Sequence, residues 1–238
     1  MKIQIADVTI ELLDVDEYTK RISRDYLTDK EHTELTIAVS EQEIALVEEE
    51  NKELDFDRRT TKSFAYLEKL DMEMLAFDAF YLHAATIAVD GFAYAFTAKS
   101  GTGKSTHIKL WKQVFGDRAF VVNGDRPFLR RIDNTLYAGG SPWCGKEGWS
   151  TNVMVPLKAL CFLERGTENK IQRVSDAEVA ERIFRQLRLP KDTEKLEKLL
   201  AILDWIVKNI PCYRLQCNME LEAAETAYEG MNGKCQGE

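Results

Sequence analysis

The sequence lacks a long apolar run, a close pair of cysteines and an excess of basic residues. No apolar stretch in its 238 residues approaches the roughly 20 that a bilayer-spanning helix needs. The chain start turns acidic at Asp7 without a long apolar segment, so a secretory signal is not expected. Its five cysteines are scattered, with no Cys-x-x-Cys spacing, which predicts neither a disulfide framework nor a zinc site. We therefore expect a cytoplasmic protein without a membrane partner.

Basic residues are outnumbered: 32 Lys and Arg face 40 Asp and Glu, for a formal net charge of -8. A nucleic-acid binder usually carries a basic footprint, so nucleic acid is not an expected partner. Hydrophobic residues make up 45% of the chain, which is ordinary for a globular protein with a real core.

Strand-like and helix-like patterns alternate along the chain, which predicts an α/β fold. We expect residues 1–78 to form an N-terminal α/β segment packed on the core, and residues 79–238 to form the main domain; a single domain is the alternative. The predicted strands are 3–12, 34–39, 81–89, 92–97, 118–122, 127–131, 135–138, 158–164 and 213–217. The predicted helices are 63–77, 107–115, 175–189, 196–210 and 218–231.

Residues 98–106 read AKSGTGKST and fit the phosphate-binding pattern G-x-x-x-x-G-K-[ST], with Ala98 in place of the first glycine. An apolar strand precedes this loop and an amphipathic helix follows it, which is the context that the motif requires. Glycines let backbone N–H groups converge on phosphate oxygens, and the positive end of the following helix faces the same anion. We expect ATP with Mg²⁺ as the ligand: Lys104 would reach the β- and γ-phosphates, and Ser105 would ligate the metal. The predicted nucleotide-binding residues are Ser100, Gly101, Thr102, Gly103, Lys104, Ser105 and Thr106.

The segment SGTGKST resembles the loop of ATP-dependent phosphoenolpyruvate carboxykinases and that of HPr kinase/phosphorylase. The second likeness extends further, over roughly residues 80–175. That family carries a histidine in a strand before the loop, where His83 stands here, and an acidic pair after the next strand, which corresponds to VVNGDRPFL at 121–129. It also has a Gly-containing segment, which corresponds to 142–152. The resemblance implies a P-loop domain with a mixed β-sheet flanked by helices, and a stand-alone HPr-kinase-like activity.

The family's paired aspartates correspond here to Gly124-Asp125, so one carboxylate is missing and the identity of the general base is left open. Asp125 is the best candidate for a carboxylate that holds Mg²⁺ or accepts the hydroxyl proton; a strand-end aspartate that caps a turn is the alternative. Glu147 is the second candidate, as metal ligand or base, and Lys146 would neutralise charge on the transferred group. The alternative for this segment is a surface loop whose Trp143 and Trp149 are anchored in the core.

Histidine and arginine side chains complete the set of candidates. The family position makes His83 a candidate to orient Asp125 or the acceptor, although a buried core histidine is the common outcome for such a residue. His107 is expected to pack. Arg126, Arg130 and Arg131 would bind an anionic substrate or the nucleotide, but strand alternation separates Arg130 from Arg131.

The leading hypothesis is a kinase that transfers the γ-phosphate of ATP to a hydroxyl, and the resemblance points to a serine of a protein or peptide. A small-molecule kinase is the first alternative, which a deep basic pocket would favour. The second is a nucleotide-binding sensor or scaffold without turnover, which Ala98 and the lost acid favour. Carboxykinase activity is not expected, because the chain is short and shows no dedicated metal cluster.

Overall fold

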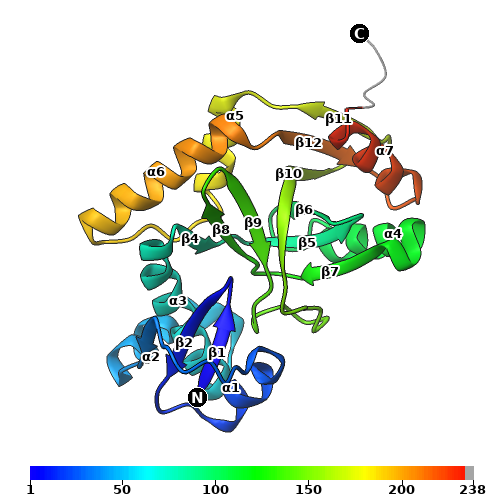
Figure 1. Ribbon diagram of the computed structural model, residues 1–238. Helices are drawn as coiled ribbons and strands as arrows, with labels where there is room; N and C mark the ends of the chain where they lie inside the picture. Colours follow the sequence, from blue (N-terminus) through cyan, green and yellow to red (C-terminus); the bar gives the residue numbers. More distant parts are fainter. Residues whose placement is uncertain (234–238) are drawn as a thin grey trace.

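The computed structural model describes residues 1–233 and has two β-sheets. Figure 1 shows a small N-terminal α/β unit below a larger, curled mixed sheet that has helices on both faces. Among the described residues, no helix is both long enough and apolar enough to cross a membrane.

The N-terminal unit is a three-stranded sheet with helices packed on it. Strand β1 (Lys2–Ile5) pairs antiparallel with β2 (Val8–Leu12), and β3 (Leu35–Ile37) pairs parallel with β2. The prediction of a single strand over 3–12 was wrong, because Ala6 and Asp7 both take positive φ and form a two-residue hairpin turn. Its helices are α1 (Glu17–Ile22), α2 (Glu41–Glu50) and α3 (Arg58–Met74).

The N-terminal unit shares a hydrophobic core with the rest of the chain. Ile3, Ile5 and Leu70 are buried in one cluster with Phe128 and Trp143, which belong to the larger part. The indole N–H of Trp143 donates to the carbonyl oxygen of Ser63 in α3 over 3.1 Å. Trp143 is therefore anchored in the core, as one interpretation of its loop predicted.

The larger sheet has the strand order β4-β8-β9-β10-β6-β5-β7, and β12 pairs with both β10 and β11. Its strands are β4 (Ala79–Tyr81), β5 (Ala84–Val89), β6 (Phe92–Thr97), β7 (Ala119–Asn123), β8 (Phe128–Ile132), β9 (Thr135–Gly139), β10 (Met154–Arg165), β11 (Lys170–Arg173) and β12 (Cys212–Cys217). The fold class is thus mixed α/β, as predicted. The sequence pattern missed β11, whose four residues are mostly exposed and carry no apolar alternation.

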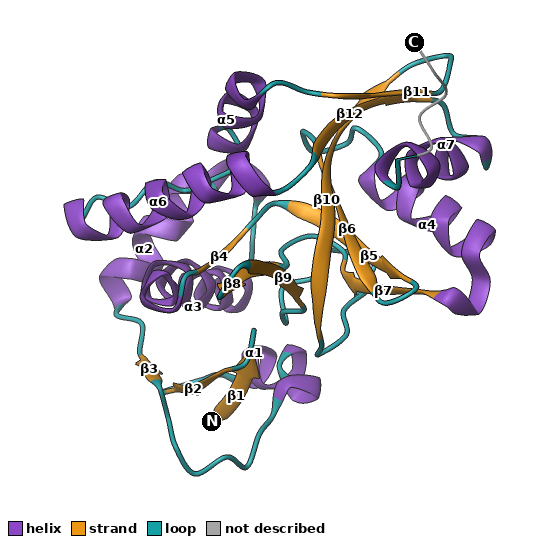
Figure 2. Ribbon diagram, turned by 45° about the horizontal axis from the view of Figure 1, so that its top comes forward, coloured by secondary structure: helices purple, strands orange, loops and turns teal. Residues whose placement is uncertain are grey.

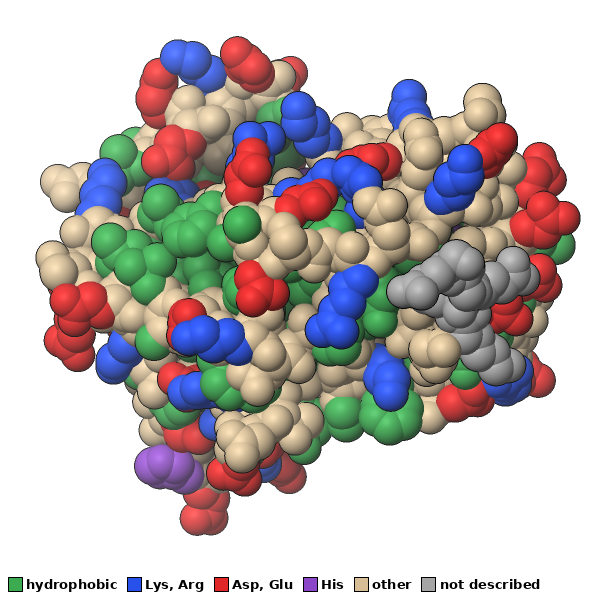
Figure 3. Space-filling model, turned by 90° about the horizontal axis from the view of Figure 1, so that it is seen from above, with side chains coloured by type: hydrophobic (Ala, Val, Ile, Leu, Met, Phe, Trp, Pro, Cys, Tyr) green, Lys and Arg blue, Asp and Glu red, His purple; other side chains and the backbone are tan. Residues whose placement is uncertain are grey.

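Helices cover the two faces of this sheet in pairs (Figure 2). Helices α4 (Lys104–Phe115) and α7 (Glu222–Met231) pack on one face, and α5 (Asp176–Phe184) and α6 (Thr193–Asn209) pack on the other. On the face seen in Figure 3, hydrophobic side chains gather over the α6 side, and charged side chains of both signs are interspersed over the rest.

Several predicted boundaries differ from the structure. The predicted strand 81–89 is interrupted at Leu82 and His83, so β4 and β5 belong to different parts of the sheet. The helix predicted over 175–189 ends at Phe184. Helix α4 begins at Lys104, three residues before the predicted start. Asn218 does not cap α7; its side chain accepts the N–H of Glu220 in a turn that precedes the helix.

The cysteines that the structure describes are all free, namely Cys144, Cys161, Cys212 and Cys217. Cys235 lies outside the described residues.

Candidate functional site

Three segments that are distant in sequence meet at one edge of the large sheet. Strand β5 lies between β6 and β7 and is antiparallel to both, so β6 and β7 run in the same direction. Their carboxyl ends and the amino end of β5 therefore lie side by side. The phosphate loop follows β6, Asp125 follows β7, and His83 precedes β5.

The phosphate loop has the backbone geometry expected of an anion cradle. Gly101 and Gly103 take φ of 76° and 123°, values that favour glycine, and nothing lies within 4 Å of a Cβ built at either position. Gly103 is the N-cap of α4 and offers no side chain to the helix N-terminus. The first N–H groups of α4 are thus available to a bound anion.

Lys104, the first residue of α4, is folded back on its own loop. The residue is only 8% exposed, and Nζ donates to the carbonyl oxygen of Ala98 over 2.8 Å. Burial lowers the pKa of Lys104, while the charge of Asp125 opposes that shift. The loop lysine and the candidate carboxylate lie at the same end of the sheet, because they follow β6 and β7, whose carboxyl ends lie side by side.

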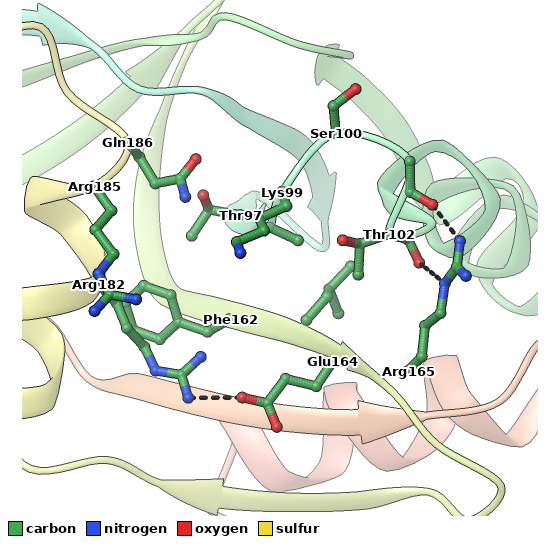
Figure 4. Close-up of a pocket in the computed structure, with 13 residues that line it drawn as sticks. Thr97, Lys99, Ser100, Thr102, Phe162, Glu164, Arg165, Arg182, Arg185 and Gln186 are labelled. Carbon is green, nitrogen blue, oxygen red and sulfur yellow. Dashed lines mark hydrogen bonds and ion pairs between the residues drawn. The ribbon is translucent and has the colours of Figure 1, made fainter.

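Arg165, at the carboxyl end of β10, holds the phosphate loop from outside. Its guanidinium donates to the carbonyl oxygens of Gly101 and Thr102, at 2.5 and 3.3 Å (Figure 4). Sequence reasoning missed this residue. The signal that would have revealed it is tertiary: β10 is parallel to β6, so both strands end beside the loop.

Asp125 is held ionised by its neighbours. Nε2 of His83 lies 3.1 Å from Oδ1, and the Arg126 guanidinium donates to Oδ2 over 2.9 Å. Burial alone would raise the pKa of Asp125, but the His83 hydrogen bond and the charges of Arg126 and Lys104 outweigh it, and the pKa lies below its usual value. The structure thus brings His83 to Asp125; because β4 and β5 are separate strands, His83 stands at the sheet edge and is only half-buried.

Asn123, the last residue of β7, builds the turn that carries Asp125, and sequence reasoning missed it. Its side chain is fully buried, and Oδ1 accepts the N–H groups of Asp125 and Arg126 at 2.8 and 2.7 Å. Its Nδ2 donates to the carbonyl oxygen and the hydroxyl of Ser141 and to the hydroxyl of Ser150. One amide therefore ties the Asp125 turn to the 139–152 loop.

Gly124 stands where the resemblance places a second acid, and the 142–152 loop fills that space. A Cβ at Gly124 would lie 2.7 Å from the carbonyl oxygen of Cys144, and the N–H of Gly124 donates to the carbonyl oxygen of Trp149 over 2.8 Å. The absence of the second carboxylate thus has a steric explanation. The main chain of the 142–152 loop occupies the space that a side chain at position 124 would need.

Lys146 and Glu147 occupy the tip of that loop. They are the central residues of a turn closed by a hydrogen bond from the N–H of Gly148 to the carbonyl oxygen of Gly145. Gly145 contacts Asp125, since a Cβ built at Gly145 would lie 3.1 Å from Cβ of Asp125. The turn is therefore beside Asp125, while both side chains are exposed and form no ion pair within residues 1–233. Their proposed roles stay predictions.

The three arginines after Asp125 have different surroundings. Arg126 is at the site, where its guanidinium also lies 4.6 Å from the ring centroid of Phe64. Arg130 donates to the main chain of Ala6, and Arg131 pairs with Asp78. Only Arg126 is thus positioned at the candidate site.

His107 packs, as expected. It is buried, its Nε2 accepts the indole N–H of Trp111 over 2.9 Å, and burial lowers its pKa to about 3. A neutral imidazole in this place supports the α4 core and lies on the helix face turned away from solvent.

Two cavities adjoin the loop, and a third lies beside His83. The first, of about 570 Å³, lies between the loop and α5 (Figure 4) and is lined in part by Lys99, Arg182 and Arg185. The second, of about 470 Å³, lies across the loop and is lined in part by Thr106 and Asn218. The third, of about 400 Å³, is lined by His83 and Arg126 and by residues of α2, α3, β4 and the turn after α5.

No protein-family model matches the chain, and no curated protein sequence matches it. Among solved structures, it is similar to the HPr(Ser) kinase/phosphatase from Coxiella burnetii, with a TM-score of 0.37 and 10% sequence identity. The match covers 65% of this chain and 95% of that one. This likeness is distant, so we base the functional proposal on the residues of the chain itself.

Proposed function

We propose that this protein binds ATP with Mg²⁺ and transfers the γ-phosphate to a hydroxyl, that of a serine in a protein or peptide. The observation that carries the proposal is the convergence of an open phosphate loop and an ionised carboxylate at one sheet edge. Phosphoryl transfer needs little covalent help from a protein; it needs positioned positive charge, metal and an oriented nucleophile.

The nucleotide would lie across the loop with its ends in different surroundings. The N–H groups of residues 100–106 and the start of α4 would bind the phosphates, and Lys104 would exchange the Ala98 carbonyl for the β- and γ-phosphates. Because Asp125 and the loop follow strands whose carboxyl ends lie side by side, the γ-phosphate would lie at the Asp125 end. The nucleoside would occupy the cavity that Thr106 and Asn218 line on the other side of the loop.

The donor atoms at the site fit Mg²⁺. Within residues 1–233 no three His, Cys, Asp or Glu side chains converge on one point. Mg²⁺ commonly keeps waters and binds one or two carboxylates plus substrate phosphates, and an ionised Asp125 with the Ser105 hydroxyl supplies that kind of partial ligand set. The metal would neutralise charge on the phosphates when bound.

The remaining groups would orient the acceptor and take its proton. His83 fixes one oxygen of Asp125, and Arg126 fixes the other. Since the transition state of phosphoryl transfer is loose, a strong base is not required. The hydroxyl proton would pass late in the reaction to Asp125 or to Glu147 on the neighbouring turn, and Lys146 would stabilise charge on the transferred group.

Calorimetry and turnover measurements test this proposal together. We expect purified protein to bind ATP·Mg²⁺, and Asp125→Asn to lose turnover while keeping the wild-type circular-dichroism spectrum. Glu147→Gln tests the second candidate for proton acceptor, because kcat should stay at the wild-type value if Asp125 takes the proton. Failure to bind ATP·Mg²⁺ at millimolar concentration would refute the proposal.

A nucleotide-binding sensor without turnover is the second candidate. Main chain fills the place of the second acid at Gly124, which favours binding over catalysis. Tight ATP·Mg²⁺ binding with no hydrolysis and no phosphate transfer to any peptide or small hydroxy compound would select this function and exclude the kinase.

A further inference from the structure

Two of the three cavities adjoin each other. The cavity beside the phosphate loop and the cavity beside His83 share Arg185 and Gln186, which directly follow α5. We call their combined lining the α5 groove. It runs from Lys99 on the loop to His83 and Arg126, the two side chains that contact Asp125.

The α5 groove is basic in an acidic protein. Six basic and three acidic side chains line it, whereas acidic residues outnumber basic ones in the whole chain. The basic residues are Lys99, Arg126, Arg165, Arg182, Arg185 and Arg188. The acidic residues are Glu50, Glu68 and Glu164. A cleft lined by one dominant sign focuses the field and attracts the opposite charge.

Two of these cations are available to a ligand. Lys99 is exposed and forms no ion pair within residues 1–233, and Figure 4 shows it on the loop side of the cavity, across from α5. Within the described residues, the one ion pair of Arg185 is with Glu181, one turn earlier, and both side chains are largely exposed. Such a surface pair is weak and is readily exchanged for a ligand carboxylate.

Other cations of the groove are already fixed. Arg182 pairs with Glu164 and Glu178, and its guanidinium lies 5.4 Å from the ring centroid of Phe162. Arg188 pairs with Glu50 and Glu68, which join α2 and α3 to the turn after α5. These ion pairs hold the walls of the groove in place, so Lys99 and Arg185 are the cations that would bind the ligand.

We propose that the α5 groove binds the phosphate acceptor as an extended acidic segment of a polypeptide. The acceptor hydroxyl lies at the His83 end, beside Asp125, and carboxylates of the segment pair with Arg185 and Lys99. Two adjoining cavities of about 570 and 400 Å³ offer more length than a small hydroxy compound fills, which favours a peptide. This inference rests on the proposed kinase function and specifies its acceptor.

Serine-centred peptide libraries with degenerate flanking positions provide the test. We expect incorporation of the γ-phosphate of ATP to favour Asp and Glu in the flanks, and to fall as salt is raised from 50 to 300 mM because screening weakens charge pairing. In Arg185→Glu, KM for the best acidic peptide should rise roughly three- to tenfold with kcat unchanged, since one rim charge contributes modestly to binding. The variant should also accept Lys- or Arg-flanked peptides better than the wild type does.

Lys208→Glu is the matched control. Lys208 pairs with Asp204 one turn earlier in α6, with exposures similar to those of the Arg185–Glu181 pair, and it is not part of the groove. The same charge reversal there should leave peptide preference as in the wild type. The inference is overturned if neutral or basic flanks are preferred, if only small hydroxy compounds are phosphorylated, or if both reversals change the preference equally. Calorimetric ATP·Mg²⁺ binding is measured in parallel, so that loss of nucleotide binding is recognised as failure of the proposed function itself.

Discussion

Replacing Gly124 by aspartate would restore in sequence the acidic pair that the HPr kinase resemblance leads one to expect. We expect a destabilised protein instead of an improved enzyme. The new Cβ would lie 2.7 Å from the carbonyl oxygen of Cys144 and 3.5 Å from that of Trp149. Both contacts are with main chain, which moves only if the 142–152 loop moves. Overpacking of this kind costs about 1–3 kcal/mol, and a carboxylate next to two carbonyl oxygens adds repulsion.

Urea unfolding at pH 7 measures this effect, and two further variants separate its causes. Gly124→Ala isolates the steric part and should lose about 1–3 kcal/mol of the free energy of unfolding. Gly139→Ala is the matched control, because its new Cβ would approach Ala6 no closer than 3.4 Å, an ordinary contact. A Gly124→Asp protein with wild-type stability and stronger Mg²⁺-dependent ATP binding would refute this reasoning and show that the loop yields easily.

Three further predictions follow from buried polar groups. Lys104→Ala should weaken ATP·Mg²⁺ binding roughly 10- to 100-fold in calorimetry, as loss of a charge-assisted hydrogen bond predicts. The control Lys109→Ala, on the exposed face of α4, should bind ATP·Mg²⁺ as the wild type does. Equal affinities of the two variants for ATP·Mg²⁺ would contradict the assignment of the phosphate loop. Asn123→Ala should lower the free energy of unfolding by roughly 2–4 kcal/mol in urea, because two part-buried N–H groups lose their acceptor. A loss below about 0.5 kcal/mol would show that the turn holds without it. Burial raises the pKa of Asp71 to about 7, so its contribution to stability is present below pH 4 and lost as pH rises toward 7. Asp71→Asn should therefore gain on the order of 2–4 kcal/mol over the wild type at pH 8 and nothing at pH 4, and a gain that does not depend on pH would exclude titration of this group as its cause.

The local signals in the sequence were strong where chemistry and backbone geometry depend on consecutive residues. The predicted strand and helix flank the loop that contains Gly101, Gly103 and Lys104. This arrangement was predictable because the conformation of the loop is set within a few residues. Strand β6 and the β8–β9 hairpin were located for the same reason: apolar runs and turn residues are local features. The α/β class followed from these elements.

The tertiary structure decided which of these local pieces form a site. His83 contacts Asp125 because β5 runs antiparallel between β6 and β7, a strand order that no local pattern contains. Arg165 was missed because its partner in the loop is 64 residues away. Asn123 makes a local turn, but only the fold shows that the same amide also binds Ser141, 18 residues away. Packing also explains Gly124, because only the folded 142–152 loop shows that a side chain there has no room.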